Sequence, residues 1–174
     1  RDPAGDGRRP PLTVRPARPD DRAAWTRIWL DSAHAGFDPL LPEGHDYPTA
    51  PPGLWEQLLA DPDVSVLVAE DAGELQGYVG CGTNRDPDAP AEVGEVRSMF
   101  VATNAWRRGV GRALMDAALD DLRDRGYTTA VVWSFAANDR ANAFYDRMGF
   151  TRDGGERSNE AWAHIPEIRY RRSL

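Results

Sequence analysis

The hydrophobic positions in the first half of the chain have the spacing of two helices and three strands. Apolar residues recur three and four positions apart around Trp25 and again around Trp55, which predicts two amphipathic helices. A short apolar run at residues 12–15 predicts a strand before the first helix. Two β-branched runs separated by Ala72 and Gly73 predict a β-hairpin after the second helix.

From residue 95 onward the pattern changes to alternating strands and helices. Residues 95–101 and 128–135 are strand-like, and the second of these is almost continuously apolar, as in a buried strand. Helical spacing covers residues 109–125 and 138–148, and a glycine follows each segment. A last strand is expected at residues 165–172. The order β-α-α-β-β-β-α-β-α-β-β predicts a mixed α/β (α+β) domain.

The length of 174 residues is that of one domain, which we expect to span residues 12–174. Residues 1–11 are rich in proline, glycine and charge, and we expect a disordered tail there. No run of 18 apolar residues exists, so no membrane span is expected, and we expect a cytoplasmic protein. The single cysteine, Cys81, excludes an intramolecular disulfide and a multi-cysteine zinc site. The three histidines lie far apart, so we expect no metal.

Charge is distributed unevenly along the chain. The formal net charge is −7, with 21 basic residues, all of them arginine, against 28 acids. Residues 1–95 carry 18 acids and 8 arginines, a net of −10, whereas residues 96–174 carry 10 acids and 13 arginines, a net of +3. The acidic total argues against nucleic-acid binding. The asymmetry favours one anionic and one cationic ligand, and ordinary surface charge is the alternative.

An arginine- and glycine-rich turn links the strand at residues 95–101 to the next helix. The sequence there is TNAWRRGVGRALM. Free N–H groups in a first helical turn bind anions, and Gly109 and Gly111 allow close approach of a ligand because they lack Cβ atoms. Arg107, Arg108 and Arg112 add hydrogen bonds to phosphate oxygens. The turn is neither a P-loop nor a dinucleotide fingerprint, and plain loop chemistry remains an alternative.

A second cluster follows on the helix at residues 138–148. Asn138, Ala141 and Tyr145 fall near one helical face, and the cluster ends at Gly149 and Phe150. A tyrosine on that face is suited to donate a proton to a leaving group. A tyrosine in the core of an ordinary α/β protein is the alternative interpretation.

Together, the glycine turn and the N-x-x-A-x-x-F-Y-x-x-x-G-F cluster resemble the motifs of the GNAT superfamily of acyl-CoA N-acyltransferases. Both motifs lie within residues 93–150. The resemblance implies a central twisted mixed sheet flanked by helices, and acetyl-CoA as co-substrate. The cofactor-binding residues that it implies are Met99, Phe100, Val101, Trp106, Arg107, Arg108, Gly109, Val110, Gly111, Arg112, Asn138, Tyr145 and Arg147.

The resemblance also implies individual roles. The backbone of Met99 and Val101 would bind the pantetheine arm together with Asn138, and the amides of residues 107–112 would hold the pyrophosphate. Arg147 stands where a basic residue often approaches the phosphates of CoA. One departure is Trp106, which occupies a position where the family motif has arginine or glutamine. We expect that position to act through its backbone.

Two catalytic residues are implied as well. Tyr145 would protonate the departing CoA thiolate. Glu95 occupies the strand position of the carboxylate that deprotonates the amine, directly or through water.

The acceptor pocket is expected from the aromatic residues. In proteins resembling this one, the loop after the first helix and the segment before the last strand line that pocket. Phe37, Tyr47 and Trp162 are the candidates, and an aromatic cluster that merely fills space under a loop is the alternative. The acidic N-terminal half favours a small cationic amine.

The sequence therefore predicts an N-acetyltransferase that moves an acetyl group from acetyl-CoA to a primary amine in a ternary complex. A covalent relay through Cys81 is a less favoured route. Two other functions remain open: a non-catalytic acyl-CoA-binding module, and an acetyltransferase of protein N-termini or lysines. Similar folds commonly dimerise, so a homodimer is a further open alternative.

Overall fold

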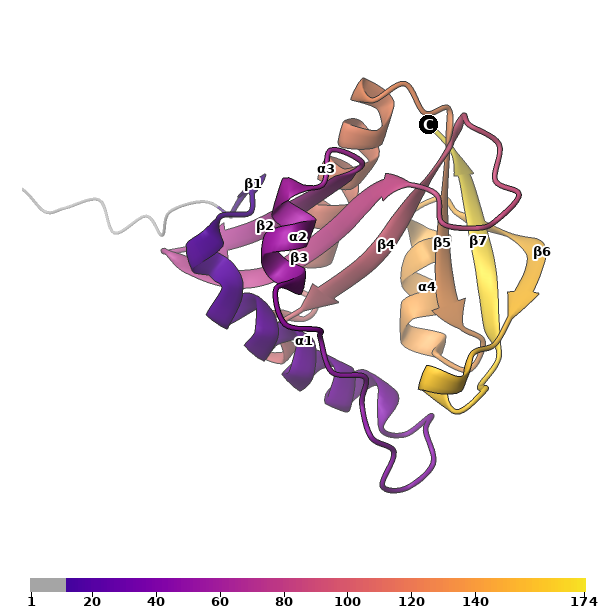
Figure 1. Cartoon of the computed structure of the whole chain (residues 1–174), viewed down its shortest axis with the longest axis horizontal. Helices are drawn as coiled ribbons and strands as arrows, with labels where there is room; N and C mark the ends of the chain where they lie inside the picture. The colour runs from indigo at the N-terminus through magenta and orange to yellow at the C-terminus, as the bar shows by residue number, and fades with distance from the viewer. Residues whose placement is uncertain (1–11) are drawn as a thin grey trace, which may run out of the picture.

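A computed structural model describes residues 12–174, so the tail expected at residues 1–11 lies outside the described residues. The fold is one seven-stranded mixed sheet with the spatial order β1-β2-β3-β4-β5-β7-β6 (Figure 1). The pair β4–β5 is parallel, and the other neighbours are antiparallel. The strands are β1 (Thr13–Pro16), β2 (Val64–Asp71), β3 (Glu74–Thr83), β4 (Val93–Val101), β5 (Thr129–Phe135), β6 (Thr151–Arg157) and β7 (Glu167–Ser173).

Two helices cover each face of the sheet. On the front face, the one turned to the viewer in Figure 1, lie α1 (Arg22–Phe37) and α2 (Leu54–Ala60). On the back lie α3 (Val110–Asp124) and α4 (Asp139–Arg147). The order of strands and helices is the predicted one, which confirms the mixed α/β fold with a sheet flanked by helices.

The two faces have separate hydrophobic cores. On the back, α3 buries one face that includes Leu114, Met115 and Leu122 against the sheet. On the front, the tilted rings of Trp25 of α1 and Trp55 of α2 pack with their centres 4.9 Å apart. Large buried apolar side chains of this kind each stabilise the fold by about 1.5–3 kcal/mol relative to exposure.

A short turn precedes the first helix. Pro19 begins a short 3₁₀ turn, Pro19–Asp21, and α1 follows it. Asp21 is buried there, and it accepts hydrogen bonds from the Arg15 guanidinium at 2.8 and 3.0 Å and from the Arg18 backbone at 2.7 Å. Bonding to Arg15 lowers the pKa of Asp21 below its usual value, so β1 and α1 are joined by an ionised carboxylate.

Two absences apply to residues 12–174. No helix there is long and apolar enough to cross a membrane. Within the same residues, no group of three or more histidine, cysteine or acidic side chains could hold a metal ion.

Candidate active site

The sheet opens between its two central strands. The parallel pairing of β4 with β5 runs only from Val93 opposite Thr129 to Val96 opposite Val132. At the next residue, Arg97, the pairing of β4 with β3 shifts by one position, a β-bulge that bends β4. Beyond the bulge the two strands diverge toward their carboxyl ends (Figure 1). The result is a gap in the middle of the sheet.

The register of β4 shows which backbone groups face this gap. Ala102 donates its N–H to Gln76 of the β3 side at 2.8 Å. Backbone groups alternate in direction along a strand, so Phe100 bonds toward β3, whereas Met99 and Val101 point toward β5. The Val101 carbonyl is already used, because it accepts hydrogen bonds from the Ser32 hydroxyl at 2.7 Å and the Trp106 indole at 2.8 Å.

Both backbone groups of Met99 and the N–H of Val101 therefore face the gap without a strand partner on that side. Phe100 differs from them. Its ring lies on the front, 5.7 Å from Tyr78 and 6.0 Å from Phe37 between centres. This arrangement favours a role for Phe100 in the acceptor side over a side-chain contact with the cofactor.

The glycine turn leads from β4 into α3. Gly109 is the residue before the helix and has φ +84°, a conformation that side chains disfavour. A Cβ atom there would meet nothing within 4 Å, so the space above the turn is open. The amides of Val110, Gly111 and Arg112 lie in the first helical turn, where N–H groups have no partner within the helix. This geometry is that of an anion-binding helix start.

Gly111 was expected to allow close approach of a ligand, but its missing side chain would face protein. A Cβ atom at Gly111 would lie 3.5 Å from the Phe144 ring and 3.8 Å from a Val101 methyl. The position faces α4 and β4 at ordinary contact distance, so a side chain there would point at protein and not at a ligand. Only the amide of Gly111 is available to hold a phosphate.

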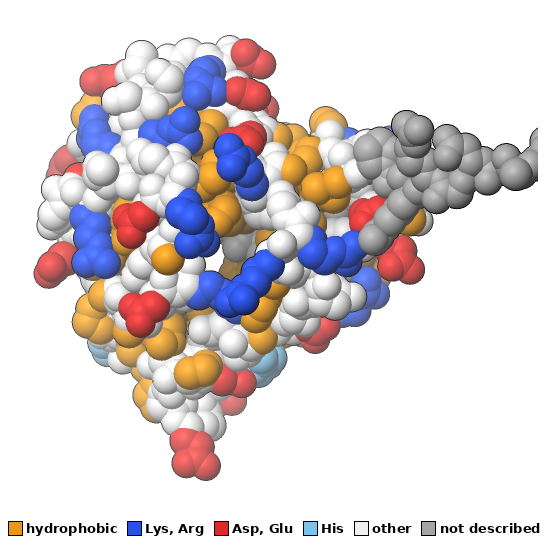
Figure 2. Space-filling model, turned by 180° about the vertical axis from the view of Figure 1, so that it is seen from behind, with side chains coloured by type: hydrophobic (Ala, Val, Ile, Leu, Met, Phe, Trp, Pro, Cys, Tyr) orange, Lys and Arg blue, Asp and Glu red, His pale blue; other side chains and the backbone are white. Residues whose placement is uncertain are grey.

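Arginines surround a hollow on the back of the molecule (Figure 2). Arg108 forms an ion pair with Asp71 at 3.4 Å, and Arg112 lies 3.8 Å from Asp116 on the next turn of α3. Arg107 has φ +61°, and neither its side chain nor that of Arg147 forms an ion pair or hydrogen bond with another residue among those described. Arg107 and Arg147 are therefore the predicted phosphate-binding arginines with unpaired charge.

The Trp106 side chain makes contacts within the protein that its sequence did not predict. Besides donating to Val101, its ring is covered by Arg140 of α4, whose guanidinium carbon lies 3.5 Å from the ring centre. The contact joins the turn after β4 to the helix after β5. Trp106 and Arg140 thus meet across the mouth of the gap.

The start of α4 fixes the end of β5. Asn138 caps the helix by accepting the Ala141 N–H at 3.2 Å, which leaves its side-chain NH₂ group to donate elsewhere. Asn142 donates to the carbonyls of Phe135 and Ala136 at 3.3 and 3.0 Å. Asn142 is buried, and its Oδ1 atom has no partner. Sequence reasoning missed Asn142 because an asparagine inside a helix has no distinctive pattern.

Tyr145 lies on the back face among aromatic residues. Its ring is 5.5 Å from Tyr170 and 6.1 Å from Phe150 between centres. Burial, and secondarily the Tyr170 phenol, raises the pKa of Tyr145 to about 12. The phenol is therefore protonated at neutral pH, as a proton donor must be. Its hydroxyl bonds to no other side chain or backbone group in residues 12–174.

Glu95 is almost fully buried, with 1% of its surface exposed. Its Oε2 accepts from the backbone N–H and Nε of Arg85, both at 3.0 Å, and its Oε1 accepts from Arg85 Nη2 at 2.7 Å. Sequence reasoning did not foresee this partner. Oε2 is saturated by two donors, so Oε1 is the atom that retains capacity to accept a proton or a water.

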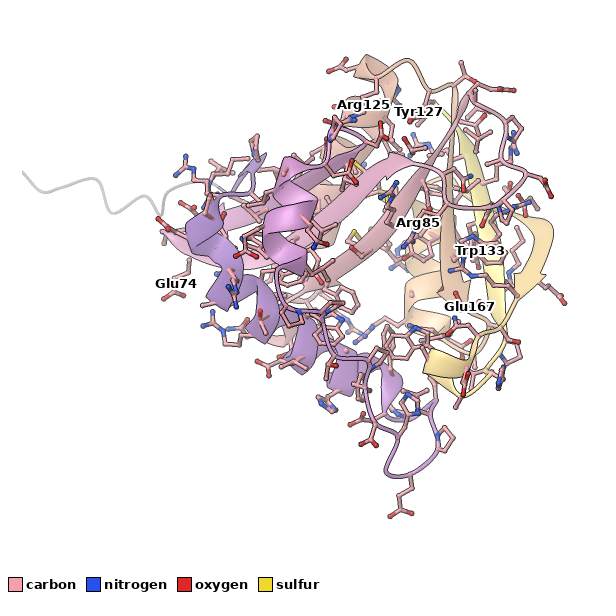
Figure 3. All side chains as sticks on the ribbon, in the orientation of Figure 1. Glu74, Arg85, Arg125, Tyr127, Trp133 and Glu167 are labelled. Carbon is pink, nitrogen blue, oxygen red and sulfur yellow. The ribbon has the colours of Figure 1, made fainter. Side chains whose placement is uncertain are left out.

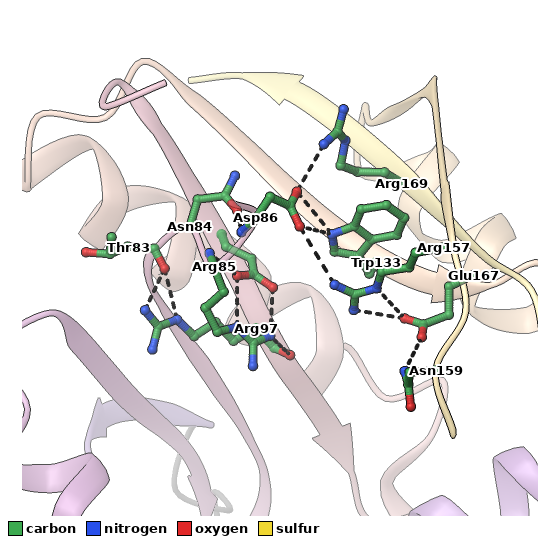
Figure 4. Close-up of polar contacts among 11 residues, drawn as sticks. Thr83, Asn84, Arg85, Asp86, Arg97, Trp133, Arg157, Asn159, Glu167 and Arg169 are labelled. Carbon is green, nitrogen blue, oxygen red and sulfur yellow. Dashed lines mark hydrogen bonds and ion pairs between the residues drawn. The ribbon is translucent and has the colours of Figure 1, made fainter. Parts of the chain in front are cut away.

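The loop before β4 forms a polar wall beside Glu95. Asp86 accepts hydrogen bonds from the Trp133 indole at 3.1 Å and from Arg169 at 3.0 Å, and Glu167 accepts from Arg157 and Asn159 (Figure 4). Arg85, Trp133 and Glu167 are spread along the front of the second half of the sheet (Figure 3). A groove of about 550 Å³ lies between the 84–90 loop and β5, β6 and β7.

The three predicted pocket residues come together at the other end of the front face. Trp162 lies 5.6 Å from Phe37 and 5.8 Å from Tyr47 between ring centres. Phe135 of β5 and His45 complete the cluster, at 5.6 and 6.2 Å from Trp162. The five rings come from three parts of the chain: residues 37–47, Phe135 of β5 and Trp162. The structure therefore brings the predicted residues together but also fills the space between them.

Cys81 is fully buried in the back core. Desolvation, and secondarily the nearby Asp121 carboxylate, raises the pKa of its thiol to about 12. The nucleophilic thiolate is therefore scarce at neutral pH.

Comparisons with known proteins agree with this geometry. The model of the acetyltransferase (GNAT) family matches residues 22–150. An uncharacterized N-acetyltransferase of Archaeoglobus fulgidus is 30% identical over 135 residues, which are 77% of this chain and 89% of that protein. A mycothiol acetyltransferase of Cellulomonas flavigena is 38% identical over 91 residues, 49% of this chain but only 26% of that longer protein.

The fold has close structural neighbours as well. The crystal structure of PaiA N-acetyltransferase from Thermoplasma acidophilum, in complex with coenzyme A, superimposes with a TM-score of 0.73. That comparison covers 95% of this chain and 100% of the other, at 12% identity, and so concerns the fold alone. The family model and the relatives define an acetyl-CoA-dependent acyltransferase. The chain belongs to the GNAT acetyltransferase family.

Proposed function

We propose that the protein transfers the acetyl group of acetyl-CoA directly to a primary amine of a small cationic molecule. The observation that carries this proposal is the gap between β4 and β5. At its mouth is the helix start at Gly109, its β4 edge presents the backbone of Met99 and Val101, and aromatic residues lie in front of it. The neighbouring PaiA structure holds coenzyme A on the same fold.

The donor would bind with its pyrophosphate at the first turn of α3. The N–H groups there and the helix dipole favour a negative charge. The pantetheine arm, which carries amide groups, would then run along β4 and pair with Met99 and Val101 as an additional strand would. The thioester would reach the front of the sheet through the gap.

The reacting ammonium group must lose two protons, one before it attacks the thioester and one after, while the departing thiolate takes up one proton and the other goes to solvent. Glu95 is our proposed base, acting through a water bonded to Oε1, because the carboxylate is buried and its other oxygen is saturated by Arg85. Tyr145 is our proposed acid, since its phenol is protonated and unbonded. The buried, protonated Cys81 supports direct transfer over a covalent relay.

A cationic acceptor is favoured by the surroundings of the aromatic cluster. Asp38 accepts hydrogen bonds from Tyr47 at 2.6 Å and His34 at 3.1 Å, and Glu160 lies two residues before Trp162. Aromatic faces attract cations, and neighbouring carboxylates add to that attraction. A small ammonium compound with an apolar part matches this lining.

One observation favours a second candidate, an acetyltransferase of protein N-termini or lysines. The groove of about 550 Å³ is lined by Arg85, the partner of Glu95, and could take an extended peptide. A peptide would run from the aromatic cluster past Glu95 toward Arg171 of β7, which lines the groove and is exposed.

A thiol-release assay with a panel of amines tests the two candidates. Polyamines, amino sugars, neutral amines of equal size and short peptides are compared by kcat/KM. Small cations should be the best substrates, and kcat/KM should fall as salt rises, because charge attraction is screened over about 10 Å at 0.1 M. Trp162→Ala should raise KM for the cation by about tenfold, since a cation–π contact contributes about 1–2 kcal/mol, whereas Trp162→Phe retains most of it.

The peptide candidate makes the opposite forecast. Under it, peptides would turn over best and Arg171→Ala would raise their KM, whereas small cations would be poor substrates. Equal turnover of neutral and cationic small amines, without salt dependence, would contradict the cationic acceptor.

A further inference from the structure

Arg140 occupies an unusual position at the mouth of the gap. Its guanidinium covers the ring of Trp106, and a Cβ atom at Gly36 of α1 would lie only 2.9 Å from its Nη2. Three elements therefore meet at this guanidinium: the turn after β4, the helix after β5 and the end of α1. The Trp106 ring is itself held to β4 by the hydrogen bond to Val101.

The charge of Arg140 has no carboxylate partner among residues 12–174. Arg85, Arg108 and Arg112 around the site are paired, with Glu95, Asp71 and Asp116 respectively. Arg140 shares its lack of a carboxylate partner with Arg107 and Arg147, but it is the one of these three that lies on the Trp106 ring. Partial burial lowers the pKa of Arg140 from its usual value, whereas bonding to Glu95 raises that of Arg85. A desolvated cation without a counter-charge is a site for an anionic ligand.

We infer that Arg140 supplies, from α4, the phosphate-binding cation that position 106 cannot supply in this chain. The inference rests on the proposed function and deepens its donor site. The motif of the glycine turn has arginine or glutamine where Trp106 stands. Here the indole holds the cation of another helix over the same turn. With one face on the ring, the guanidinium keeps its edge N–H groups free for two oxygens of the CoA diphosphate.

A purely structural role for Arg140 makes a different forecast. The guanidinium lies beside the last turn of α1, where partial negative charge on the helix end attracts a cation. If that attraction is its whole role, removing the charge lowers the stability of the fold and weakens the binding of CoA and of pantetheine equally. If Arg140 binds the diphosphate, its removal lowers the affinity only for donors that carry the phosphates.

Calorimetric titration of CoA and of pantetheine, which lacks all phosphates, separates the two roles. Arg140→Ala and Arg140→Gln should weaken CoA binding about 10- to 100-fold, the value of a hydrogen bond to a charged group, and change pantetheine binding less than about twofold. Arg123→Ala, at the far end of α3, removes the same charge and should change neither. Thermal unfolding of each variant reports any loss of folded protein, and Arg140→Gln retains the side-chain stem if alanine is not tolerated.

A double variant that moves the positive charge from position 140 to position 106 provides the decisive test. Adding Trp106→Arg to Arg140→Ala should recover at least about fivefold of the lost CoA affinity, because a cation again stands over the turn. Equal weakening of CoA and pantetheine by the Arg140 variants, or unchanged CoA binding, would overturn the inference. Failure of the wild-type protein to bind CoA would instead overturn the proposed function.

Discussion

The two glycines of the donor turn are expected to respond oppositely to the same substitution. Gly109 has φ +84° and open space above it, so Gly109→Ala adds no clash but places a side chain in a left-handed conformation. That strain costs about 1–2 kcal/mol, and the lower entropy of the unfolded chain offsets up to about 1 kcal/mol. A net loss near 1 kcal/mol lowers the Tm of a domain this size by about 2–4 °C.

Gly111→Ala has none of this strain. Its new methyl group would lie at ordinary contact distance, 3.5 Å from Phe144 and 3.8 Å from Val101. Alanine is favoured over glycine in a helix by up to about 1 kcal/mol, so the Tm should rise by up to about 4 °C. Because that methyl faces protein, CoA binding should be unchanged.

The assay is thermal unfolding without ligand, followed by calorimetric titration with CoA. The methyl at Gly109 stands in the space assigned to the diphosphate, so Gly109→Ala should weaken CoA binding by about tenfold or more, the value of one lost hydrogen bond to a charged group. Gly111→Ala serves as the matched control. Tight CoA binding by Gly109→Ala together with weak binding by Gly111→Ala would refute the assignment of the turn.

Two further predictions concern a catalytic group and a structural ion pair. Tyr145→Phe removes an unbonded hydroxyl, so stopped-flow measurement of thiol release should show a kcat about 10²- to 10⁴-fold lower. The stability of the fold and the CoA affinity should be unchanged. An unaltered kcat under conditions where the chemical step is rate-limiting would assign the proton donor to another residue. The folded-state pKa of Asp21 lies below its unfolded value, so its contribution to stability is full above about pH 4 and is lost as pH falls through the folded pKa. Urea unfolding between pH 3 and 6 should therefore show a smaller acid-induced loss for Asp21→Asn than for the wild type, and identical slopes would contradict this.

Much of the fold is predictable from local patterns. The strand and helix order follows from apolar spacing, and glycines with positive φ at 109, 126 and 149 mark helix boundaries as expected. The gap between β4 and β5 is not readable in this way. It depends on the bulge at Arg97, which is a property of pairing between strands rather than of one segment.

The residues proposed for the site belong in part to local motifs. Met99, Val101 and Tyr145 are of this kind, and the structure places the backbone of Met99 and Val101 at the gap and Tyr145 in the back core. The partners Arg85 of Glu95 and Arg140 of Trp106 were missed, because each pair joins residues 10 or 34 positions apart with no periodic spacing to signal it. Long-range ion pairs and ring contacts are decided by the folded topology.

The central claim is that acetyl-CoA lies in the gap between β4 and β5, and a crystal structure of the protein with CoA tests it most directly. The account predicts diphosphate oxygens on the amides of Val110 to Arg112, pantetheine amides paired with Met99 and Val101, and the sulfur within hydrogen-bond distance of the Tyr145 hydroxyl. CoA bound elsewhere, or with its sulfur remote from Tyr145, would contradict the account.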